Sequence, residues 1–269
     1  MTTETTGRVL PLSGRTVVVT RAAAQAAPFV SLLEAAGARV LEAATIAIEP
    51  PASWAPLDAA LERLDDYEWV VFTSVNGVRM VARRLDERGL GWSGFASKRV
   101  AAIGPATARA LAVHGVRTEL VPDEYRAEAL VERLRAEVHP GDGVLLPRAA
   151  RTRDLLVREL TRLGARVDEV PAYETHTVRD AAGPLRAALG AGEVDVVTFT
   201  SSSTVLSFVR LFSAEERARW FPRLTVAAIG PITRATAAEQ GLATAIMPEE
   251  YTIPGLARAI EAYFSERSR

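Results

Sequence analysis

Residues 100–107 read Val100-Ala101-Ala102-Ile103-Gly104-Pro105-Ala106-Thr107, and almost the same string returns as Val226-Ala227-Ala228-Ile229-Gly230-Pro231-Ile232-Thr233. Three further strings recur in the same order at nearly the same spacing: Phe72-Thr73-Ser74 with Phe199-Thr200-Ser201, Gly37-Ala38-Arg39-Val40 with Gly164-Ala165-Arg166-Val167, and Pro122-x-Glu124-Tyr125 with Pro248-x-Glu250-Tyr251. A period of domain length far exceeds the 20–50 residues of a solenoid repeat. The sequence therefore predicts two similar domains, with the function in a cleft where they face each other.

The composition is that of an ordinary soluble globular protein. The 269 residues are 48% hydrophobic and 24% charged, with a formal net charge of −1 and no cysteine. Such a small net charge gives no overall attraction to nucleic acid or to an anionic membrane. The absence of cysteine excludes disulfides and thiolate chemistry. Because residues 1–7 are polar, unlike a signal peptide, we expect a cytoplasmic protein with neither a nucleic-acid partner nor a membrane association.

Short β-branched runs alternate with segments of helical period. Val17-Val18-Val19-Thr20 is typical of a buried parallel strand, and the helix predicted over about 23–36 ends at Gly37. The other strands are predicted near 39–42, 69–72, 99–103, 118–121, 143–146, 166–169, 195–199, 225–229 and 243–246. This alternation predicts an α/β protein of two flavodoxin-like, doubly wound parallel-sheet domains with about five strands each.

Two segments interrupt the alternation. Residues 45–51 are extended and end in a proline pair, and residues 171–177 occupy the corresponding place in the second repeat. Proline and partly polar alternation disfavour a central strand. We expect both segments to be linkers rather than core strands.

Hydroxyl-bearing residues recur where strands pass into helices. In open parallel sheets, ligands bind beyond the carboxyl ends of the strands, where helix N-termini present free N–H groups. Ser74 and Asn76 follow one predicted strand, and Ser201 and Ser202 follow its repeat partner. Serine here is also an ordinary N-cap worth about 1 kcal/mol. The duplication at matching positions favours binding of anionic oxygens, so these four residues are candidates for substrate binding.

Two further pairs of residues recur in the repeat and are also candidates for substrate binding at the carboxyl ends of the strands. Thr107 and Thr233 lie in the first turn after the Ile-Gly-Pro sequences, near the positive end of the helix dipole. Arg21 and Arg148 each follow a predicted strand. An arginine there can hold a carboxylate through two hydrogen bonds. Capping for the threonines and a surface ion pair for the arginines are equally open alternatives.

Other kinds of catalytic machinery find no support in the sequence. The histidines at 114, 139 and 176 do not have metal-ligand spacing. The chain contains no glycine-rich phosphate loop followed by lysine and no nucleophile elbow. We therefore predict neither a metal nor a cofactor.

Taken together, these motifs resemble those of the uroporphyrinogen-III synthases, enzymes of tetrapyrrole biosynthesis. The resemblance covers essentially the whole chain through Val18-Val19-Thr20-Arg21, Phe72-Thr73-Ser74-x-x-Gly77-Val78, Ala102-Ile103-Gly104-Pro105-x-Thr107, Tyr173-Glu174-Thr175, Thr198-Phe199-Thr200-Ser201-Ser202 and Ile229-Gly230-Pro231-x-Thr233. Each motif is short and degenerate, and the ensemble is fairly specific. The resemblance implies interleaved domains: residues 1–45 with 178–269, and residues 51–170, joined by linkers at 46–50 and 171–177.

The resemblance also implies an activity. Members of this family are lyases that dehydrate and cyclise hydroxymethylbilane, a linear tetrapyrrole, and invert its ring D to give uroporphyrinogen III. The family's linker tyrosine corresponds to Tyr173, which is the candidate acid for loss of the substrate hydroxyl. Thr107 and Thr233 match the family's cleft threonines. We expect a monomer with this small molecule as its partner.

Two other functions stay open at this point. A relative of the same fold could bind a tetrapyrrole as a sensor or regulator without catalysis. The fold alone would also suit a two-domain receptor for small anions, against which the missing signal peptide counts. The isomer formed from hydroxymethylbilane separates these functions, because uncatalysed closure gives isomer I.

Overall fold

The structure is a computed structural model of the chain that describes residues 10–150 and 154–267. It divides into two compact units. The first is built from two stretches of chain, residues up to Ala47 and residues from His176 onwards, and the second is Ile48–Thr175.

Within the described residues the strands form two five-stranded sheets, one ordered β10-β9-β8-β1-β2 and the other β3-β7-β6-β4-β5. The strands are β1 (Thr16–Val19), β2 (Arg39–Glu42), β3 (Ile46–Glu49), β4 (Trp69–Phe72), β5 (Arg99–Ala102), β6 (Gly143–Ala149), β7 (Arg166–Thr177), β8 (Val196–Phe199), β9 (Thr225–Ala228) and β10 (Thr244–Ile246). The helices are α1 (Ala23–Ala35), α2 (Ala55–Glu62), α3 (Val75–Glu87), α4 (Pro105–Ala112), α5 (Ala127–Arg135), α6 (Leu155–Arg162), α7 (Ala182–Gly190), α8 (Ser202–Arg210), α9 (Ala214–Trp220), α10 (Pro231–Glu239) and α11 (Ile253–Arg267). Short 3₁₀ helices lie at Leu64–Asp66, Ser93–Ser97 and Phe221–Arg223.

The predicted α/β class with two doubly wound sheets is confirmed. In the first unit the strand order is β2-β1-β8-β9-β10, and the registered pairs are parallel. In the second unit β7, β6, β4 and β5 are neighbours in the order that β2, β1, β8 and β9 have in the first, and their registered pairs are parallel. The fifth strand differs: it is β3 beyond β7 in the second unit and β10 beyond β9 in the first. The carboxyl ends of β7, β6, β4 and β5 therefore lie at one edge of the sheet.

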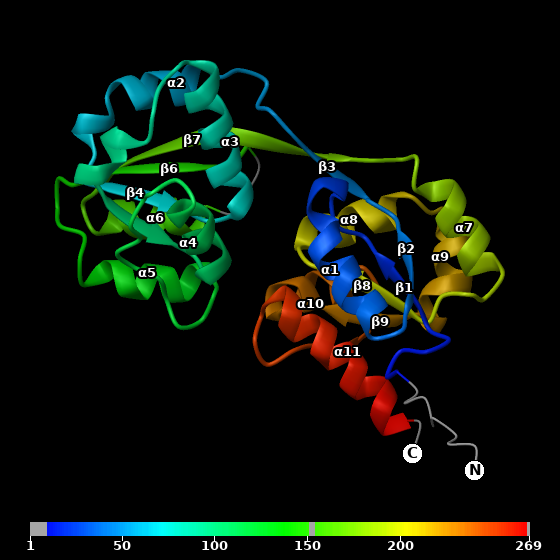
Figure 1. The fold of residues 1–269 in the computed structure, drawn as a ribbon. Coiled ribbons are helices and arrows are strands. Elements are labelled where there is room, and N and C mark those ends of the chain that lie inside the picture. The colour runs from blue at the N-terminus through cyan, green and yellow to red at the C-terminus, as the bar shows by residue number, and fades with distance from the viewer. Residues whose placement is uncertain (1–9, 151–153, 268–269) are drawn as a thin grey trace, which may run out of the picture. The chain divides into compact units, whose positions relative to one another are not determined.

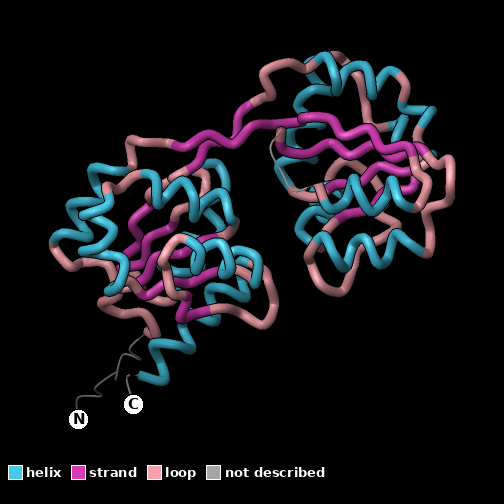
Figure 2. The backbone as a smooth tube through the Cα atoms, turned by 180° about the vertical axis from the view of Figure 1, so that it is seen from behind, coloured by secondary structure: helices cyan, strands magenta, loops and turns pink. Residues whose placement is uncertain are grey.

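Helices cover both faces of each sheet (Figure 1). In the second unit, Val70 and Phe72 pack with α2, α3 and α4 on one face, and Trp69 and Val71 pack with α5 and α6 on the other. The first unit repeats this arrangement, with α7, α8 and α10 on one face and α1 and α11 on the other. The view from behind in Figure 2 shows the strands between helices in each unit. This two-sided burial explains why the central strands are continuous apolar runs.

Two predictions about strands need correction. Residues 46–50 and 171–177 were expected to be linkers rather than strands, but β3 covers Ile46–Glu49 and β7 continues to Thr177, and these two strands are hydrogen-bonded neighbours. The division between the two units falls within both segments. Pro171 is tolerated within β7 because it removes only one N–H donor, its own. The rest of this long strand stays paired. The strand expected at 118–121 is a single bridge between Ala101 and Leu120. Pro122 follows and cannot donate the next ladder hydrogen bond.

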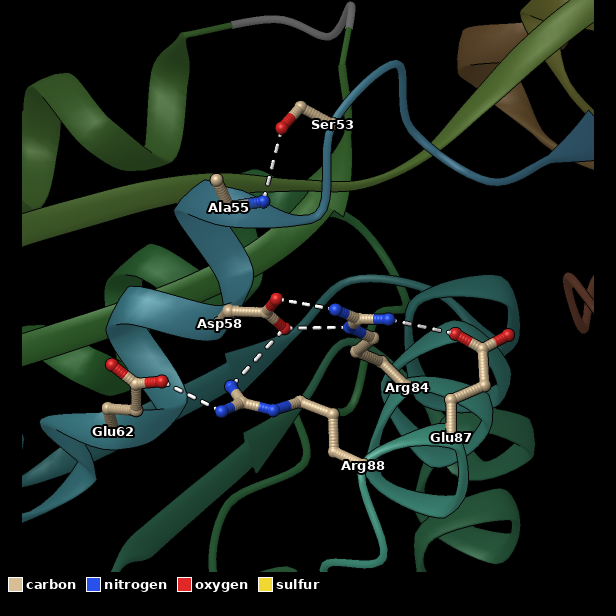
Figure 3. A network of polar contacts seen from close by, with 7 residues as sticks. All are labelled: Ser53, Ala55, Asp58, Glu62, Arg84, Glu87 and Arg88. Carbon is tan, nitrogen blue, oxygen red and sulfur yellow. Dashed lines mark hydrogen bonds and ion pairs between the residues drawn. The ribbon is translucent and has the colours of Figure 1, made fainter.

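A network of charged side chains joins α2 to α3 (Figure 3). Asp58 accepts hydrogen bonds from Arg84 through both carboxylate oxygens, from Nε at 2.7 Å and from Nη2 at 2.5 Å. Arg88 lies 3.5 Å from the same carboxylate and donates to Glu62 at 2.7 Å. Arg84 also donates to Glu87 within its own helix. The network fixes α2 against α3, which begins at the edge where the candidate residues lie.

Across the described residues, none of the helices combines the length and the apolar character needed to span a bilayer.

Candidate active site

Five of the residues chosen from sequence lie along one edge of the second unit's sheet. Ser74 and Asn76 follow β4, and Thr107 follows β5. Arg148 lies near the end of β6, and Tyr173 lies on β7 directly beside the end of β6. Because these strands are parallel neighbours, the five residues share the carboxyl edge.

Tyr173 is held by polar groups at this edge. Its ring is buried, with 8% of the residue exposed. The phenol oxygen lies 3.0 Å from Oγ of Ser74, and the side chain of Asn76 also forms a hydrogen bond with it. Burial raises the pKa of Tyr173 above its usual value of 10, whereas the hydrogen bonds of Ser74 and Asn76 and the charge of Arg148 act in the opposite direction. The phenol is therefore fully protonated at neutral pH.

Arg148 was a candidate for binding a substrate carboxylate, with a surface ion pair as the open alternative. The residue is only 3% exposed and forms an ion pair within the sheet. Its Nε and Nη2 both lie 2.7 Å from Oε1 of Glu169 on the neighbouring strand. The guanidinium thus already has a carboxylate partner, and its charge acts on the phenol of Tyr173. Sequence reasoning missed Glu169, because nothing in the spacing pairs it with Arg148.

The first unit brings the other candidates to the corresponding edge. Arg21 follows β1, Ser201 and Ser202 follow β8, and Thr233 follows β9, and these strands are neighbours. Arg21 donates a hydrogen bond from Nε to Oε1 of Gln25 at 3.3 Å. Oγ of Ser202 lies 2.7 Å from Oγ1 of Thr236 on α10. The structure therefore connects α8 to α10 through hydroxyl groups at this edge.

Thr107 and Thr233 are almost completely buried, with 3% and 5% of each residue exposed. Each lies in the first turn of its helix, behind the proline that begins it. The N–H of Thr107 donates to the carbonyl oxygen of Gly104 at 3.1 Å. Burial of this degree means that both threonines shape the helix start more than they offer a side chain to a ligand.

Five helices that begin at these two edges carry no acidic residue in their first turns. These are α1, α3, α4, α8 and α10, whereas α6, which follows β6, has Asp154 at its N-cap, and α5 and α9 have glutamates in their first turns. Free N–H groups and the positive end of the dipole at a helix start favour anions. In the five helices without acidic residues, no carboxylate of the first turn neutralises this potential. Each edge, taken by itself, is therefore suited to binding anionic groups.

Tyr125 and Tyr251 are a pair that sequence reasoning left without a role. Their rings pack on Gly104 and Gly230, where an added Cβ would lie 3.2 Å and 3.3 Å from the nearest ring or Cβ atom. The signal was present, because both belong to the repeated Pro-x-Glu-Tyr string. Each tyrosine covers the turn that starts α4 or α10.

No group of three histidine, aspartate or glutamate side chains that could hold a metal ion occurs in the part of the chain that the structure describes. The polar groups that face one another at the second edge are instead a phenol, a hydroxyl, an amide and an ion pair. Such a set can donate a proton and stabilise the negative charge that the proton leaves behind.

The fold and this site together define a class: duplicated, doubly wound α/β proteins with a buried phenol among helix N-termini. The family model described as "Uroporphyrinogen-III synthase HemD" matches residues 27–258. A uroporphyrinogen-III synthase of Synechococcus elongatus is 37% identical over 257 residues, covering 94% of this chain and 97% of that protein. One of Chlorobaculum parvum is 29% identical over 259 residues, covering 91% and 98%.

Solved structures agree on the fold. A mutant uroporphyrinogen III synthase of Thermus thermophilus superposes with a TM-score of 0.67 at 19% identity, covering 94% of this chain and 99% of that one. The uroporphyrinogen-III synthetase of Helicobacter pylori gives a TM-score of 0.54 at 15% identity, covering 95% and 99%. The chain belongs to the uroporphyrinogen-III synthase family. The resemblance found in the sequence is confirmed, and with it the assignment to an enzyme family of the lyase class.

Proposed function

We propose that this chain dehydrates and cyclises hydroxymethylbilane, with inversion of ring D, to give uroporphyrinogen III. Membership of the family supports the reaction. The observation on this chain that carries the proposal is the phenol of Tyr173, buried among Ser74, Asn76 and Arg148 at the sheet edge. A protonated phenol in this setting is an acid that is available at every physiological pH.

The first step is loss of the substrate's terminal hydroxyl group. Tyr173 donates its proton to the hydroxyl oxygen while the carbon–oxygen bond breaks and its electron pair goes to that oxygen. The products are water, a phenolate on Tyr173 and a positively charged azafulvenium on the pyrrole. The pyrrole supplies the electrons that replace those of the broken bond. No oxidant or reductant takes part.

The second step decides the isomer. The ring-D carbon that carries the bridge to ring C attacks the azafulvenium and gives a spiro intermediate. The bond from this carbon to the bridge then breaks, and its electron pair stays with ring D, which leaves the bridge as a second azafulvenium. The unsubstituted α-carbon of ring D attacks this bridge and closes the macrocycle, and the proton that it loses balances the one that Tyr173 gave up. The free bilane closes without inversion, so the protein must hold a conformation that the free substrate rarely adopts. Positioning of this kind accounts for large rate effects without many catalytic groups.

The substrate's carboxylates need partners that a chain with a net charge of −1 does not supply overall. We assign them to the N–H groups at the starts of α3, α4, α8 and α10, assisted by Arg21, Ser201 and Ser202. The lack of acidic residues in these first turns supports this assignment. Thr107 and Thr233 support two of these helix starts from within, and Arg148 acts by its charge.

Replacement of Tyr173 by phenylalanine tests the proposal. We expect Tyr173→Phe to lower kcat by about 10²–10⁴-fold, the usual contribution of a general acid, with KM little changed because the ring remains. The measurement generates hydroxymethylbilane in situ and separates the oxidised isomers I and III by chromatography. Tyr67→Phe is a matched control, because Tyr67 is also buried and hydrogen-bonded, to Asp168, but precedes β4 at the opposite edge.

Two outcomes would contradict the proposal. Unchanged kcat in Tyr173→Phe would remove the phenol from the reaction. Tight binding of the bilane by the unmodified protein with isomer I as the only product would instead identify a tetrapyrrole sensor. We further propose that the protein acts as a monomer in the cytoplasm, which sedimentation velocity and cell fractionation would test.

A further inference from the structure

The internal repeat places two serines at equivalent helix starts with different surroundings. Ser74 caps α3 and Ser201 caps α8, and both have extended backbones, with φ near −164° and −167°. In α8 the N-cap is a reciprocal capping box. Oγ of Ser201 accepts from the N–H of Thr204, and the N–H of Ser201 donates to Oγ1 of Thr204, both at 3.3 Å.

The cap of α3 does not close in this way. Gly77 stands where α8 has Thr204, so no side chain returns to the capping residue. The glycine is packed against β6, since an added Cβ would lie 3.1 Å from the carbonyl oxygen of Pro147. Oγ of Ser74 accepts from the N–H of Gly77 at 3.0 Å and also lies 3.0 Å from the phenol oxygen of Tyr173.

The hydrogen bond between Oγ of Ser74 and the phenol oxygen of Tyr173 can run in either direction. The Gly77 N–H occupies an acceptor site of Oγ, and the hydroxyl proton can be donated to the phenol oxygen of Tyr173. When Ser74 donates, the phenol keeps its own proton free for another acceptor. Asn76, two residues further along the same helix, forms a second hydrogen bond with the phenol. The guanidinium of Arg148 adds positive charge, reduced by its ion pair with Glu169.

We propose that the open cap of α3 serves as a phenolate hole, in which Ser74 and Asn76 donate to the oxygen of Tyr173 as it loses its proton and Arg148 stabilises the charge. Ser74 is then a positioning residue for Tyr173 rather than a ligand for a substrate carboxylate, as the sequence had suggested. This inference rests on the proposed function for the identity of the proton acceptor. The contacts of Ser74 with Tyr173 do not depend on it.

The first half of the test measures the phenol without substrate. The full-length protein is labelled with tyrosine carrying ¹³C at Cζ, and the signal of Tyr173 is assigned by its loss in Tyr173→Phe. We expect Ser74→Ala to raise the pKa of this phenol by about one unit, the effect of one lost hydrogen bond. Ser74→Thr restores the original titration because it keeps the hydroxyl. We expect Glu169→Gln to lower the pKa of the Tyr173 phenol, because Glu169 then no longer neutralises the positive charge of Arg148.

Ser201→Ala is the matched control, because it removes the same cap at the equivalent helix, where the serine hydroxyl bonds the N–H of Thr204. It should leave the titration of Tyr173 unchanged, although each Ser→Ala loses about 1 kcal/mol of capping. If Ser74→Ala does not fold, Ser74→Gly lacks the hydroxyl while keeping most of the cap. An unchanged titration in the alanine or glycine variant, or an equal shift in Ser201→Ala, would overturn the inference.

The second half measures turnover. We expect Ser74→Ala to lower kcat about tenfold, in line with the shift of one unit, and to leave KM within a factor of two. A rise in KM with kcat unchanged would place Ser74 on the substrate and overturn the inference. If the unmodified protein formed no uroporphyrinogen III, the proposed function would fail, while the titration would still decide whether the cap controls the phenol.

Discussion

At the scale of single residues, Gly143 shows how closely the second unit is packed. It begins β6, and an added Cβ would lie only 2.3 Å from the backbone carbonyl oxygen of Asp66. We expect Gly143→Ala to lower the free energy of unfolding by about 1–3 kcal/mol through overpacking. At Gly183 in α7, no atom lies within 4 Å of an added Cβ. Gly183→Ala should therefore raise the free energy of unfolding by about 0.5–1 kcal/mol. Urea unfolding measures the change in the free energy of unfolding for each variant. If both variants were less stable than the unmodified protein, the prediction for Gly183 would be wrong.

The sequence allowed the choice of residues but not their partners. Ser74 and Tyr173 were candidates, one from the repeat and the other from the resemblance, yet their contact joins positions 99 apart in the chain. The ion pair of Arg148 with Glu169 likewise depends on the register of β6 against β7. Contacts between neighbouring strands follow from tertiary pairing, which hydrophobic periodicity does not encode.

At the scale of elements, the link between α2 and α3 makes a prediction about acid stability. Hydrogen bonds from Arg84 hold the pKa of Asp58 below its ordinary value. The unfolded state therefore takes up a proton at higher pH than the folded state does. The stabilisation is present above pH of about 4, the unfolded value, and is lost as the pH falls through the folded value.

Asp58→Asn tests this prediction. It should lower the urea midpoint at pH 7, because Arg84 and Arg88 lose their shared carboxylate. The difference from the unmodified protein should shrink as the pH falls from about 4, the unfolded value, through the lower pKa of Asp58 in the folded protein. A difference that stays constant over this range would show that the charge of Asp58 does not contribute.

The errors in predicted elements have a common physical origin. Strands buried on both faces, such as β4 and β8, are short apolar runs and were found from sequence. β3 and the outer part of β7 are half-buried and partly polar, so their pattern is that of an extended connection. Their pairing with each other, rather than their composition, makes them strands.

At the scale of the whole molecule, the two units differ in how the chain builds them. The second unit is one continuous stretch, Ile48–Thr175, whereas the first needs residues from both ends of the chain. β1 lies between β2 and β8, and α1 supplies Phe29 and Leu33 to the core of the first unit. Neither end of the chain contains a complete sheet or a complete core.

Separate expression of the two stretches tests this difference. Residues 48–175 should give a dispersed amide NMR spectrum and a cooperative thermal transition. Residues 176–269 alone should give neither, because the sheet loses β1 and β2 and the apolar face that α1 covers is exposed. Adding residues 1–47 in excess should restore the transition. A dispersed spectrum from 176–269 alone would contradict the prediction.

The divided first unit also has a consequence for biosynthesis. β1, α1 and β2 leave the ribosome first, but the strand that pairs with β1 on its other side emerges only after the entire second unit has been translated. That wait lasts on the order of ten seconds at usual elongation rates. The second unit, whose synthesis starts later, is thus the first to be completed. In the meantime the nascent Val17-Val18-Val19 run has no β8 to pair with. This exposed apolar run is therefore a natural target for chaperones.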